Sequence, residues 1–421
     1  MRFELPYGHS SVAVHVPENF SVDLIEPEKI VAVENPEQLV TLALDHLLGG
    51  ADWERAAASN SVAIAVNDKT RPVPHHHLLP PLMAKLKMLG IPDMAITFYL
   101  AVGTHPPMAA SEFPIALPPE ILANYTVVSH NSEDPEQLVY LGETKRGTPV
   151  WVNQGYAMAD YKIVVGNIEP HQFAGFSGGV KSAAIGLCGM QTINHNHNLM
   201  TDPASELGKY EHNPMRQDIE DIGRLIGVDL ALNAVLDQDR QIAHALVGEP
   251  RAVMLAGMPL AQEICQLTVK RPYDLLLVSP GGHPKDINVY QAQKALRHAA
   301  RIANPGAHVF IAAACPEGAG SQHYEDWMVG KLTYQDIIKQ FIAEGFRVGP
   351  HKAFQIARDA SKVHLHWYSE MDIGNAHRLL LNPVTDLQGA VDSALASLKS
   401  GNLIGVLPHA ASTIPTIDSR S

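Results

Sequence analysis

The sequence predicts an α/β protein of two domains, each with a largely parallel sheet, and an active-site cleft between the domains. Its 421 residues are many for a single hydrophobic core, and the 46% that are apolar are enough to fill two cores. Short apolar runs typical of buried strands alternate with longer stretches of helical periodicity, which is the order that α/β layers require. We place the boundary near residue 268, which gives domains of residues 1–268 and 269–421.

In the first domain, apolar runs bounded by turn residues predict strands, and apolar residues at helical spacing predict helices. The expected strands are 62–66, 95–101, 125–129, 162–166 and 228–237. The expected helices are 36–48 and 78–89, followed by a connecting helix at 252–269. The histidine run 75–77, which follows PVP, is interpreted as a solvated loop.

The second domain repeats the alternation of strands and helices. PYDLLLVSPGG, which begins at residue 272, predicts a strand, and residues 288–303 predict a helix. AHVFIAAACPEG and KVHLHWYS predict two further strands. The last stretch, GNLIGVLPHAASTIPTI, either returns to the cleft or closes the second domain.

Composition and charge exclude several classes of protein. The net charge of −13, without a basic stripe, argues against binding to nucleic acid. No run of eighteen apolar residues occurs and the first residues do not resemble a signal sequence, so we expect a soluble, cytoplasmic protein. The cysteines are widely separated, which suits a reducing compartment and argues against a structural zinc. They are Cys188, Cys265 and Cys315.

Residues 166–198 (GNIEPHQFAGFSGGVKSAAIGLCGMQTINHNHN) hold the densest group of side chains capable of chemistry. They follow the expected strand 162–166, so His171 emerges where α/β enzymes place ligands. The segment then turns through Gly175, Gly178 and Gly179. Such glycines let the backbone approach a ligand and turn its N–H groups toward an anion such as phosphate, with Lys181 at the rim. Neither a GxGxxG nor a GxxxxGK[ST] motif occurs.

This segment resembles the nickel-dependent lactate racemase family, and the resemblance spans roughly residues 60 to 300. The matching motifs are Asn67-Asp68-Lys69-Thr70-Arg71-Pro72 after VAIAV, Gly103-Thr104-His105 after ITFYLAV, then His171, Lys181 and His197, and finally Tyr290, Gln291 and Lys294 in NVYQAQKAL. A set of motifs in this order is specific in a way that no single member is.

The resemblance implies a site for the nickel-pincer nucleotide, a pyridinium mononucleotide whose thiocarbonyl arms bind nickel. By position, Lys181 joins this cofactor covalently and His197 is the protein ligand of the nickel. An amine near other cations titrates low enough to act as a nucleophile, and neutral imidazole suits a nickel ion already bound to sulfur. His195 is a second candidate ligand, but the spacing from Lys181 and the preceding Asn196 favour His197. The other implied cofactor-binding residues are Asp68, Arg71, Gly178 and Gly179.

The resemblance also implies reversible hydride transfer, with His105 and His171 as the catalytic pair. One histidine removes the hydroxyl proton of a 2-hydroxy acid while the C2 hydride passes to the cofactor; a 2-keto acid stays bound and the hydride returns to its other face. A histidine on each side serves either enantiomer, and its ordinary pKa lies near working pH. The implied substrate-binding residues are Arg71, Tyr290, Gln291 and Lys294. Arg71 thus has two assignments, the substrate carboxylate and the cofactor phosphate.

The sequence leaves the substrate open among lactate, malate, another short hydroxy acid and a sugar acid such as gluconate. Val180 stands before Lys181, where lactate-specific members often carry a basic residue. The expected partners are this small molecule and the proteins that assemble the cofactor, with no nucleic acid and no membrane. Two other interpretations stay open: a metal-dependent hydrolase or NAD-dependent dehydrogenase on the same α/β layers, and a nucleotide-binding protein without catalysis.

Overall fold

The structure is a computed structural model, and it describes residues 1–27, 32–399 and 401–418. The chain divides into two compact units. The larger unit is Lys29–Ile264, and the smaller unit combines Met1–Glu28 with Cys265–Ser421. The division after residue 264 is close to the expected boundary at 268. The assignment of the N-terminal residues to the first domain was wrong, because β3 (Ser21–Leu24) pairs with β18 (Leu403–Leu407) in the sheet of the smaller unit.

The larger unit is built on a six-stranded sheet in the order β13-β12-β9-β4-β5-β6. Its strands are β4 (Val62–Asn67), β5 (Ile96–Ala101), β6 (Thr126–Ser129), β9 (Tyr161–Asn167), β12 (Leu230–Leu236) and β13 (Ile242–Gly248). The neighbours from β12 to β6 run parallel, and β13 is antiparallel at the edge. The five strands predicted from apolar runs in this region are thereby confirmed.

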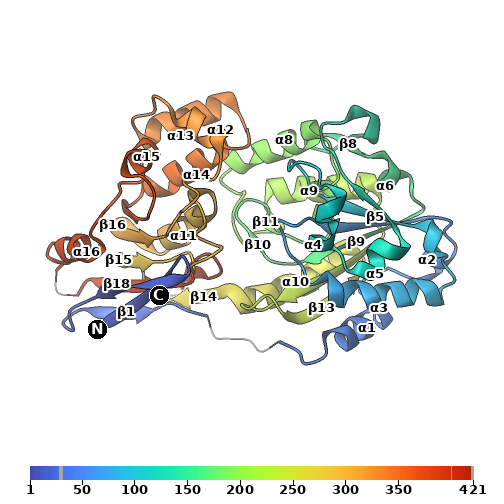
Figure 1. The fold of residues 1–421 in the computed structure, drawn as a ribbon, viewed down its shortest axis with the longest axis horizontal. Coiled ribbons are helices and arrows are strands. Elements are labelled where there is room, and N and C mark those ends of the chain that lie inside the picture. Colours follow the sequence, from blue (N-terminus) through green and yellow to red (C-terminus); the bar gives the residue numbers. More distant parts are fainter. Residues whose placement is uncertain (28–31, 400, 419–421) are drawn as a thin grey trace. The chain divides into compact units, whose positions relative to one another are not determined.

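Helices surround this sheet (Figure 1). They are α1 (Pro36–Asp45), α2 (Glu54–Ala57), α3 (His75–Met88), α4 (Phe113–Ala116), α5 (Pro119–Asn124), α6 (Gln154–Met158), α7 (Lys181–Ala184), α8 (Met190–Asn198), α9 (Pro214–Ile226) and α10 (Pro250–Cys265). Ile64 and Val66 of β4 pack with Leu79 and Leu82 of α3 in one core. Two antiparallel hairpins add β7 (Leu138–Glu143) with β8 (Pro149–Asn153), and β10 (Pro170–His171) with β11 (Gly175–Phe176).

Helix α3 begins earlier than predicted. The histidine run 75–77, interpreted as a solvated loop, is its first turn. His75 is buried, and its Nδ1 donates a hydrogen bond to the carbonyl oxygen of Ala116 at 2.7 Å. Burial lowers the pKa of His75 to about 4, so the ring is neutral. The local sequence predicted an exposed histidine at position 75. Packing against Ala116, 41 residues away in sequence, buries the ring instead.

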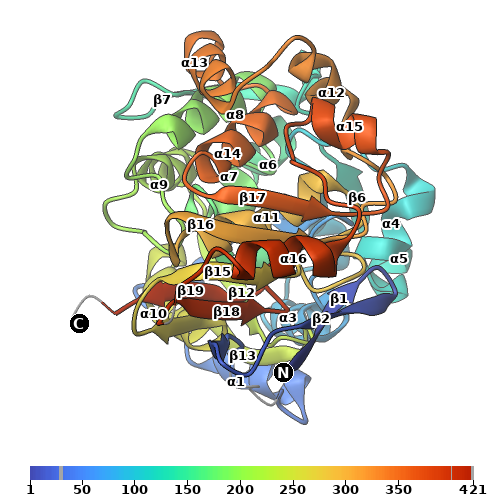
Figure 2. The same cartoon turned by 90° about the vertical axis from the view of Figure 1, so that its left-hand side faces the viewer.

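The smaller unit contains a five-stranded parallel sheet in the order β17-β16-β15-β18-β3. Its other strands are β15 (Tyr273–Val278), β16 (Ala303–Ala312) and β17 (His364–Tyr368). Alternate residues of β15 serve two cores: Leu276 packs with α11 (Val289–Ala300) and Leu277 with α16 (Leu387–Leu395). Figure 2 shows α16 lying across these strands.

The remaining helices of the smaller unit are α12 (Gln322–Met328), α13 (Tyr334–Glu344), α14 (Pro350–Ala360) and α15 (Ile373–Arg378). The hairpin of β1 (Arg2–Tyr7) and β2 (Ser10–His15) packs into the core that contains α16. The final stretch of the chain forms β18 within the sheet and β19 (Ile414–Ile417) beside β14 (Gln266–Val269), so it helps to build this unit. Across the described residues, no helix is long and apolar enough to cross a membrane.

Candidate active site

The strand order of the larger unit reverses between β4 and β9. From β4 the chain adds β5 and β6 on one side of the sheet, and later β9 and β12 on the other. Loops that leave such neighbouring strands diverge, and the crevice between them is the usual ligand site of open α/β sheets. Asn67 ends β4 and Asn167 ends β9, and both line a cavity at this position.

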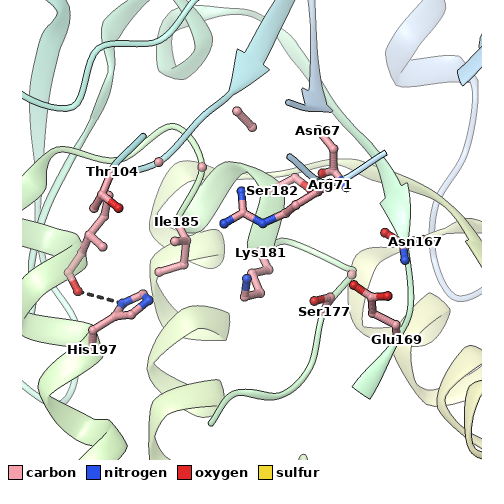
Figure 3. A pocket seen from close by; sticks show the side chains of 15 residues that line it. Asn67, Arg71, Thr104, Asn167, Glu169, Ser177, Lys181, Ser182, Ile185 and His197 are labelled. Carbon is pink, nitrogen blue, oxygen red and sulfur yellow. Dashed lines mark hydrogen bonds between the residues drawn. The ribbon is translucent and has the colours of Figure 1, made fainter. Parts of the chain in front are cut away.

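The cavity has an empty volume of about 590 Å³, including its opening to solvent. Figure 3 shows the side chains that line it: Asn67, Arg71, Thr104, Asn167, Glu169, Ser177, Lys181, Ser182, Ile185 and His197. Of the predicted cofactor and metal residues, the structure therefore brings Arg71, Gly178, Lys181 and His197 together.

Lys181 is the first residue of α7, and its side chain lies in the cavity between His197 and Ser177 (Figure 3). Burial, reinforced by the charges of Arg71 and Arg216, lowers the pKa of Lys181 to about 7. A large fraction of this amine is unprotonated at neutral pH. Only the unprotonated amine is a nucleophile, so the cavity presents a reactive lysine.

His197, on α8, also lines the cavity (Figure 3). Its Nδ1 donates to the carbonyl oxygen of Ile193 at 2.9 Å, so the lone pair of the neutral ring is on Nε2. Burial, with the charge of Lys181, lowers the pKa of His197 to about 3. His195 is exposed and contacts Thr148 instead, at 2.8 Å, and it does not line the cavity. The structure thus separates the two histidines that the sequence left as alternatives.

Asp68 and His105 form a hydrogen-bonded pair at the ends of β4 and β5. Nδ1 of His105 donates to Oδ2 of Asp68 at 2.8 Å, and the Thr70 hydroxyl donates to Oδ1 at 2.7 Å. Burial acts to raise the pKa of Asp68, but the His105 hydrogen bond, the Arg71 charge and the Thr70 hydrogen bond outweigh burial and hold this pKa below its ordinary value. The ionised carboxylate therefore keeps the proton of the neutral ring on Nδ1, and Nε2 of His105 can accept a proton. Asp68, predicted as a cofactor residue, thus contacts a predicted catalytic histidine.

His171 ends strand β10 of the short hairpin. Its Nδ1 accepts the backbone N–H groups of Phe173 and Ala174 at 3.4 and 3.2 Å. A neutral ring in this position carries its proton on Nε2, the reverse of His105. Neither His105 nor His171 lines the cavity itself, although Thr104, next to His105, and Glu169, two residues before His171, do.

The loop that carries Lys181 is held by Arg216, which sequence reasoning missed. This guanidinium is fully buried and donates to the carbonyl oxygens of Phe176 and Gly178 at 2.9 and 3.1 Å. It also pairs with the carboxylate of Glu220 at 2.6 Å. In sequence, Arg216 and Glu220 form an i,i+4 pair, a pattern usually found on solvated helix surfaces. Nothing local in the sequence distinguishes this pair from a surface pair.

The glycines of this loop allow close packing. Gly178 and Gly179 have positive φ angles of +91° and +56°, and a Cβ at Gly179 would lie 2.7 Å from Cγ of Met254. The N–H of Gly179 donates to Oδ1 of Asn233 at 2.7 Å. The prediction that this N–H faces an anion is therefore wrong, because a protein side chain already accepts its hydrogen bond. Gly179 also lies outside the cavity lining.

The remaining predicted substrate residues, Tyr290, Gln291 and Lys294, lie on α11 in the smaller unit. All three are partly exposed, and Nζ of Lys294 donates to Oε1 of Gln291 at 3.0 Å. Asn288 caps the helix by accepting from the N–H of Gln291 at 3.1 Å. Their role in substrate binding stays a prediction.

A metal ion at His197 would need ligands from a bound molecule. Within residues 1–27, 32–399 and 401–418, no three His, Cys, Asp or Glu side chains form a group that could hold a metal. The three cysteines are buried, and none of them forms a disulfide. A cofactor that brings its own sulfur donors would complete the coordination of a metal held by one imidazole.

Arg216→Met is expected to destabilise the protein by about 3–5 kcal/mol, because it leaves the buried carboxylate of Glu220 without its cation. Chemical denaturation of the variant and the wild type measures this difference. Arg224→Met is the matched control on the same helix, since Arg224 is exposed and pairs with Asp221, and it should cost less than about 1 kcal/mol. Equal losses of unfolding free energy in the two variants would show that the pair of Arg216 and Glu220 does not support the loop that carries Lys181.

Comparisons with known proteins cover most of the chain. A family model described as the lactate racemase N-terminal domain matches residues 7–208, and one described as the lactate racemase C-terminal domain matches residues 268–414. A lactate racemase of Thermoanaerobacterium thermosaccharolyticum is 28% identical over 349 residues, 81% of each chain. A lactate racemase of Lactiplantibacillus plantarum is 29% identical over 326 residues, 76% of each chain.

Solved structures agree with this similarity. The lactate racemase apoprotein from T. thermosaccharolyticum superimposes with a TM-score of 0.91 and 26% sequence identity, covering 99% of this chain and all of that one. A protein from Thermotoga maritima has a TM-score of 0.63 and 14% identity over 92% of this chain, a similarity of fold alone. These comparisons confirm the predicted resemblance and the α/β class with mostly parallel sheets.

Proposed function

The chain belongs to the lactate racemase family, a family of isomerases, and on that premise we propose that it interconverts the enantiomers of a short 2-hydroxy acid, with lactate as the reference substrate. The observation that carries the proposal is the convergence of Lys181 and His197 on one cavity at the strand-order reversal. The resemblance implies that Lys181 forms a covalent bond to the cofactor and that His197 binds its nickel.

The residues present fit the nickel-pincer nucleotide. Lys181 offers an amine with a pKa of about 7, and His197 offers a neutral ring whose Nε2 carries the lone pair. Arg71 also lines the cavity and suits a phosphate or a carboxylate, since a guanidinium can donate two parallel hydrogen bonds to either. When bound, the cofactor supplies a reversible acceptor for the hydride at C2 of the substrate.

The chain itself handles the proton of the substrate hydroxyl. His105, with Nδ1 fixed by Asp68, can accept this proton at Nε2. His171 accepts two backbone N–H groups at Nδ1, so in its neutral form it carries a hydrogen on Nε2. Two histidines whose Nε2 atoms differ in this way suit a reaction in which one residue removes a proton from the substrate and the other residue donates one. We therefore propose His105 and His171 as the catalytic pair.

Racemisation is tested with the cofactor-loaded chain and single enantiomers of lactate. We expect either enantiomer to be converted to the racemate, and deuterium at C2 to slow turnover by a primary isotope effect, because the bond to that hydrogen breaks. Malate and gluconate test the substrate class in parallel. Binding of all three acids without conversion would contradict the proposal and favour a protein without catalysis.

His197→Ala is expected to remove nickel while leaving the covalent adduct on Lys181 intact, because the two residues hold different parts of the cofactor. Elemental analysis measures the metal and intact mass measures the adduct. His195→Ala is the matched control from the same helix and should retain nickel, since His195 lies outside the cavity lining. Loss of nickel from the His195 variant alone would reverse the assignment.

A further inference from the structure

A second cavity lies within the smaller unit, at the carboxyl end of β17. It has an empty volume of about 610 Å³, including its opening to solvent. The elements that border it, β17 and α15, can be followed in Figure 2. All of its lining residues belong to this unit, and none of them is assigned above to the cofactor, the metal or the substrate. The cavity is therefore separate from the candidate active site.

Main-chain hydrogen bonds hold the walls of this second cavity. The N–H of Trp367 donates to the carbonyl oxygen of Asn382 at 3.1 Å, and the N–H of Val384 donates to the carbonyl oxygen of Trp367 at 2.9 Å. The N–H of Glu370 donates to the carbonyl oxygen of Ala314 at 3.0 Å. These bonds tie the end of β17 to the two segments that complete the wall, so the cavity is a preformed feature of the fold.

Backbone strain gathers around the same walls. Leu380 and Asn382 have positive φ angles of +58° and +50°, and Cys315, whose thiol meets the Trp367 indole, has a φ of +51°. Among the described residues, Arg240 is the one other non-glycine residue with a positive φ. A backbone of this kind is unfavourable for a residue with a Cβ, and such positions concentrate at ligand sites. Three of the four positions in this chain lie around one cavity.

The cavity wall is negatively charged. Of the described residues that line it, Glu370 alone carries a charge, and this side chain is exposed to solvent. Burial raises the pKa of the Tyr7 phenol, and the charge of Glu370 adds to that effect. Glu370 also acts in the same direction on the pKa of the Cys315 thiol. Its field therefore extends over the lining of the cavity.

A buried carboxylate beside the cavity adds to this negative field. Asp286 is fully buried, and its charge also raises the pKa of Tyr7. Its Oδ2 accepts the backbone N–H groups of Gly8 and Ala314 at 2.7 and 3.1 Å, whereas its Oδ1 has no hydrogen-bond partner among the described residues. Within the described parts of the chain, no basic side chain forms an ion pair with Asp286 or Glu370. The negative charge at the cavity thus has no counter-charge from this region of the protein.

Aromatic rings give a cation a second source of attraction. The rings of Tyr7 and Tyr368, which both line the cavity, lie 5.4 Å apart between centroids with planes tilted by 41°. The face of an aromatic ring attracts a cation, and this attraction increases when the cation is partly desolvated. Met371 and Ile373 add apolar surface that suits a hydrocarbon chain.

We propose that this cavity binds a small organic ammonium ion with a short hydrocarbon body. Glu370 supplies the counter-charge, the rings of Tyr7 and Tyr368 face the cationic head, and the apolar side chains cover the hydrocarbon. An anionic ligand is disfavoured, since it would meet a carboxylate and no basic group in the lining. The site does not use the covalent cofactor, so it is independent of the proposed racemase activity.

Calorimetry of the full chain with three probes of similar size tests the charge preference. The probes are n-butylammonium, 1-butanol and butyrate, each titrated at neutral pH. We expect n-butylammonium to bind to one site at least tenfold more tightly than 1-butanol, and butyrate not to bind there. Equal affinities for n-butylammonium and 1-butanol would identify an apolar cavity without a charge preference and would overturn the proposal. Absence of n-butylammonium binding would overturn it as well.

Glu370→Gln should weaken n-butylammonium binding about tenfold and leave 1-butanol binding unchanged, because glutamine removes the charge and keeps the shape. Glu18→Gln is the matched control, since Glu18 is an exposed carboxylate of the same unit outside the cavity lining. It should change neither affinity. Equal weakening in the two variants would show a general effect of net charge and would end the assignment to this cavity.

Thr385→Trp tests the location of the bound probe. Thr385 is an exposed residue of the lining, so an indole at this position should fill the cavity and abolish binding of both n-butylammonium and 1-butanol. Its unfolding midpoint should stay within about two degrees of the wild-type value, as expected for a surface substitution. Undiminished n-butylammonium binding by a folded Thr385 variant would place the probe elsewhere and contradict the proposal. If this variant fails to fold, the comparison of Glu370→Gln with Glu18→Gln decides.

Discussion

Lys181→Ala is expected to leave the chain with no covalently attached nucleotide and no racemase activity. The reason is that Lys181 is the nucleophile we assign to the cavity, where burial lowers the pKa of its amine to about 7. Intact mass after exposure to the cofactor-assembly proteins measures the adduct directly, without relying on turnover. An adduct of unchanged mass on the variant would end the assignment.

Lys181→Arg is the matched control for charge. Arginine keeps the positive charge but stays protonated, so it cannot act as a nucleophile. The arginine variant should therefore also lack the adduct, which distinguishes loss of the nucleophile from loss of a cation. If it carries the adduct, another residue is the point of attachment.

The reactivity of Lys181 should depend on pH with a defined sign. Because the amine reacts only when unprotonated, its rate of acylation should fall as pH falls through about 7. A lysine of ordinary pKa loses reactivity at far higher pH, so competitive labelling followed by mass spectrometry distinguishes the two classes. A pH profile for Lys181 that matches the exposed Lys145 would contradict the effect of burial.

Asp68→Asn is expected to reduce kcat by roughly 10²–10⁴-fold while leaving the Lys181 adduct in place. The carboxylate of Asp68 accepts from Nδ1 of His105 at 2.8 Å and so directs the basic lone pair to Nε2. The amide of asparagine carries no charge and offers an N–H in place of one carboxylate oxygen, so the preferred tautomer of His105 can reverse. Steady-state kinetics of the loaded enzyme measures the effect.

Asp45→Asn is the control for that substitution, because Asp45 is a half-exposed carboxylate of the same unit that pairs with Lys85. It should leave kcat unchanged. An Asp68 variant with kcat close to the wild-type value would show that the His105 pair is not used in catalysis. Loss of the adduct as well would return Asp68 to the cofactor-binding role predicted from sequence.

Much of the larger unit follows from the order of residues alone. Apolar runs such as VAIAV at 62–66 specify buried strands, because parallel strands covered on both faces need apolar side chains at every position. The ends of those strands, and hence the motifs around Asp68, His105 and His171, follow directly. The family resemblance, carried by motifs in a specific order, also assigned Lys181 and His197 to one site.

Only the tertiary structure decided which partners the site residues contact and how their pKa values are shifted. Asp68 meets His105 across 37 positions of sequence, and Gly179 gives its N–H to Asn233 across 54. The N-terminal strand β3 joins a sheet whose other strands begin after residue 264. Sequence patterns report the periodicity of single elements, whereas pairing between distant elements depends on the packing of the whole unit. The lowered pKa of Lys181 depends on burial, and only folding creates burial.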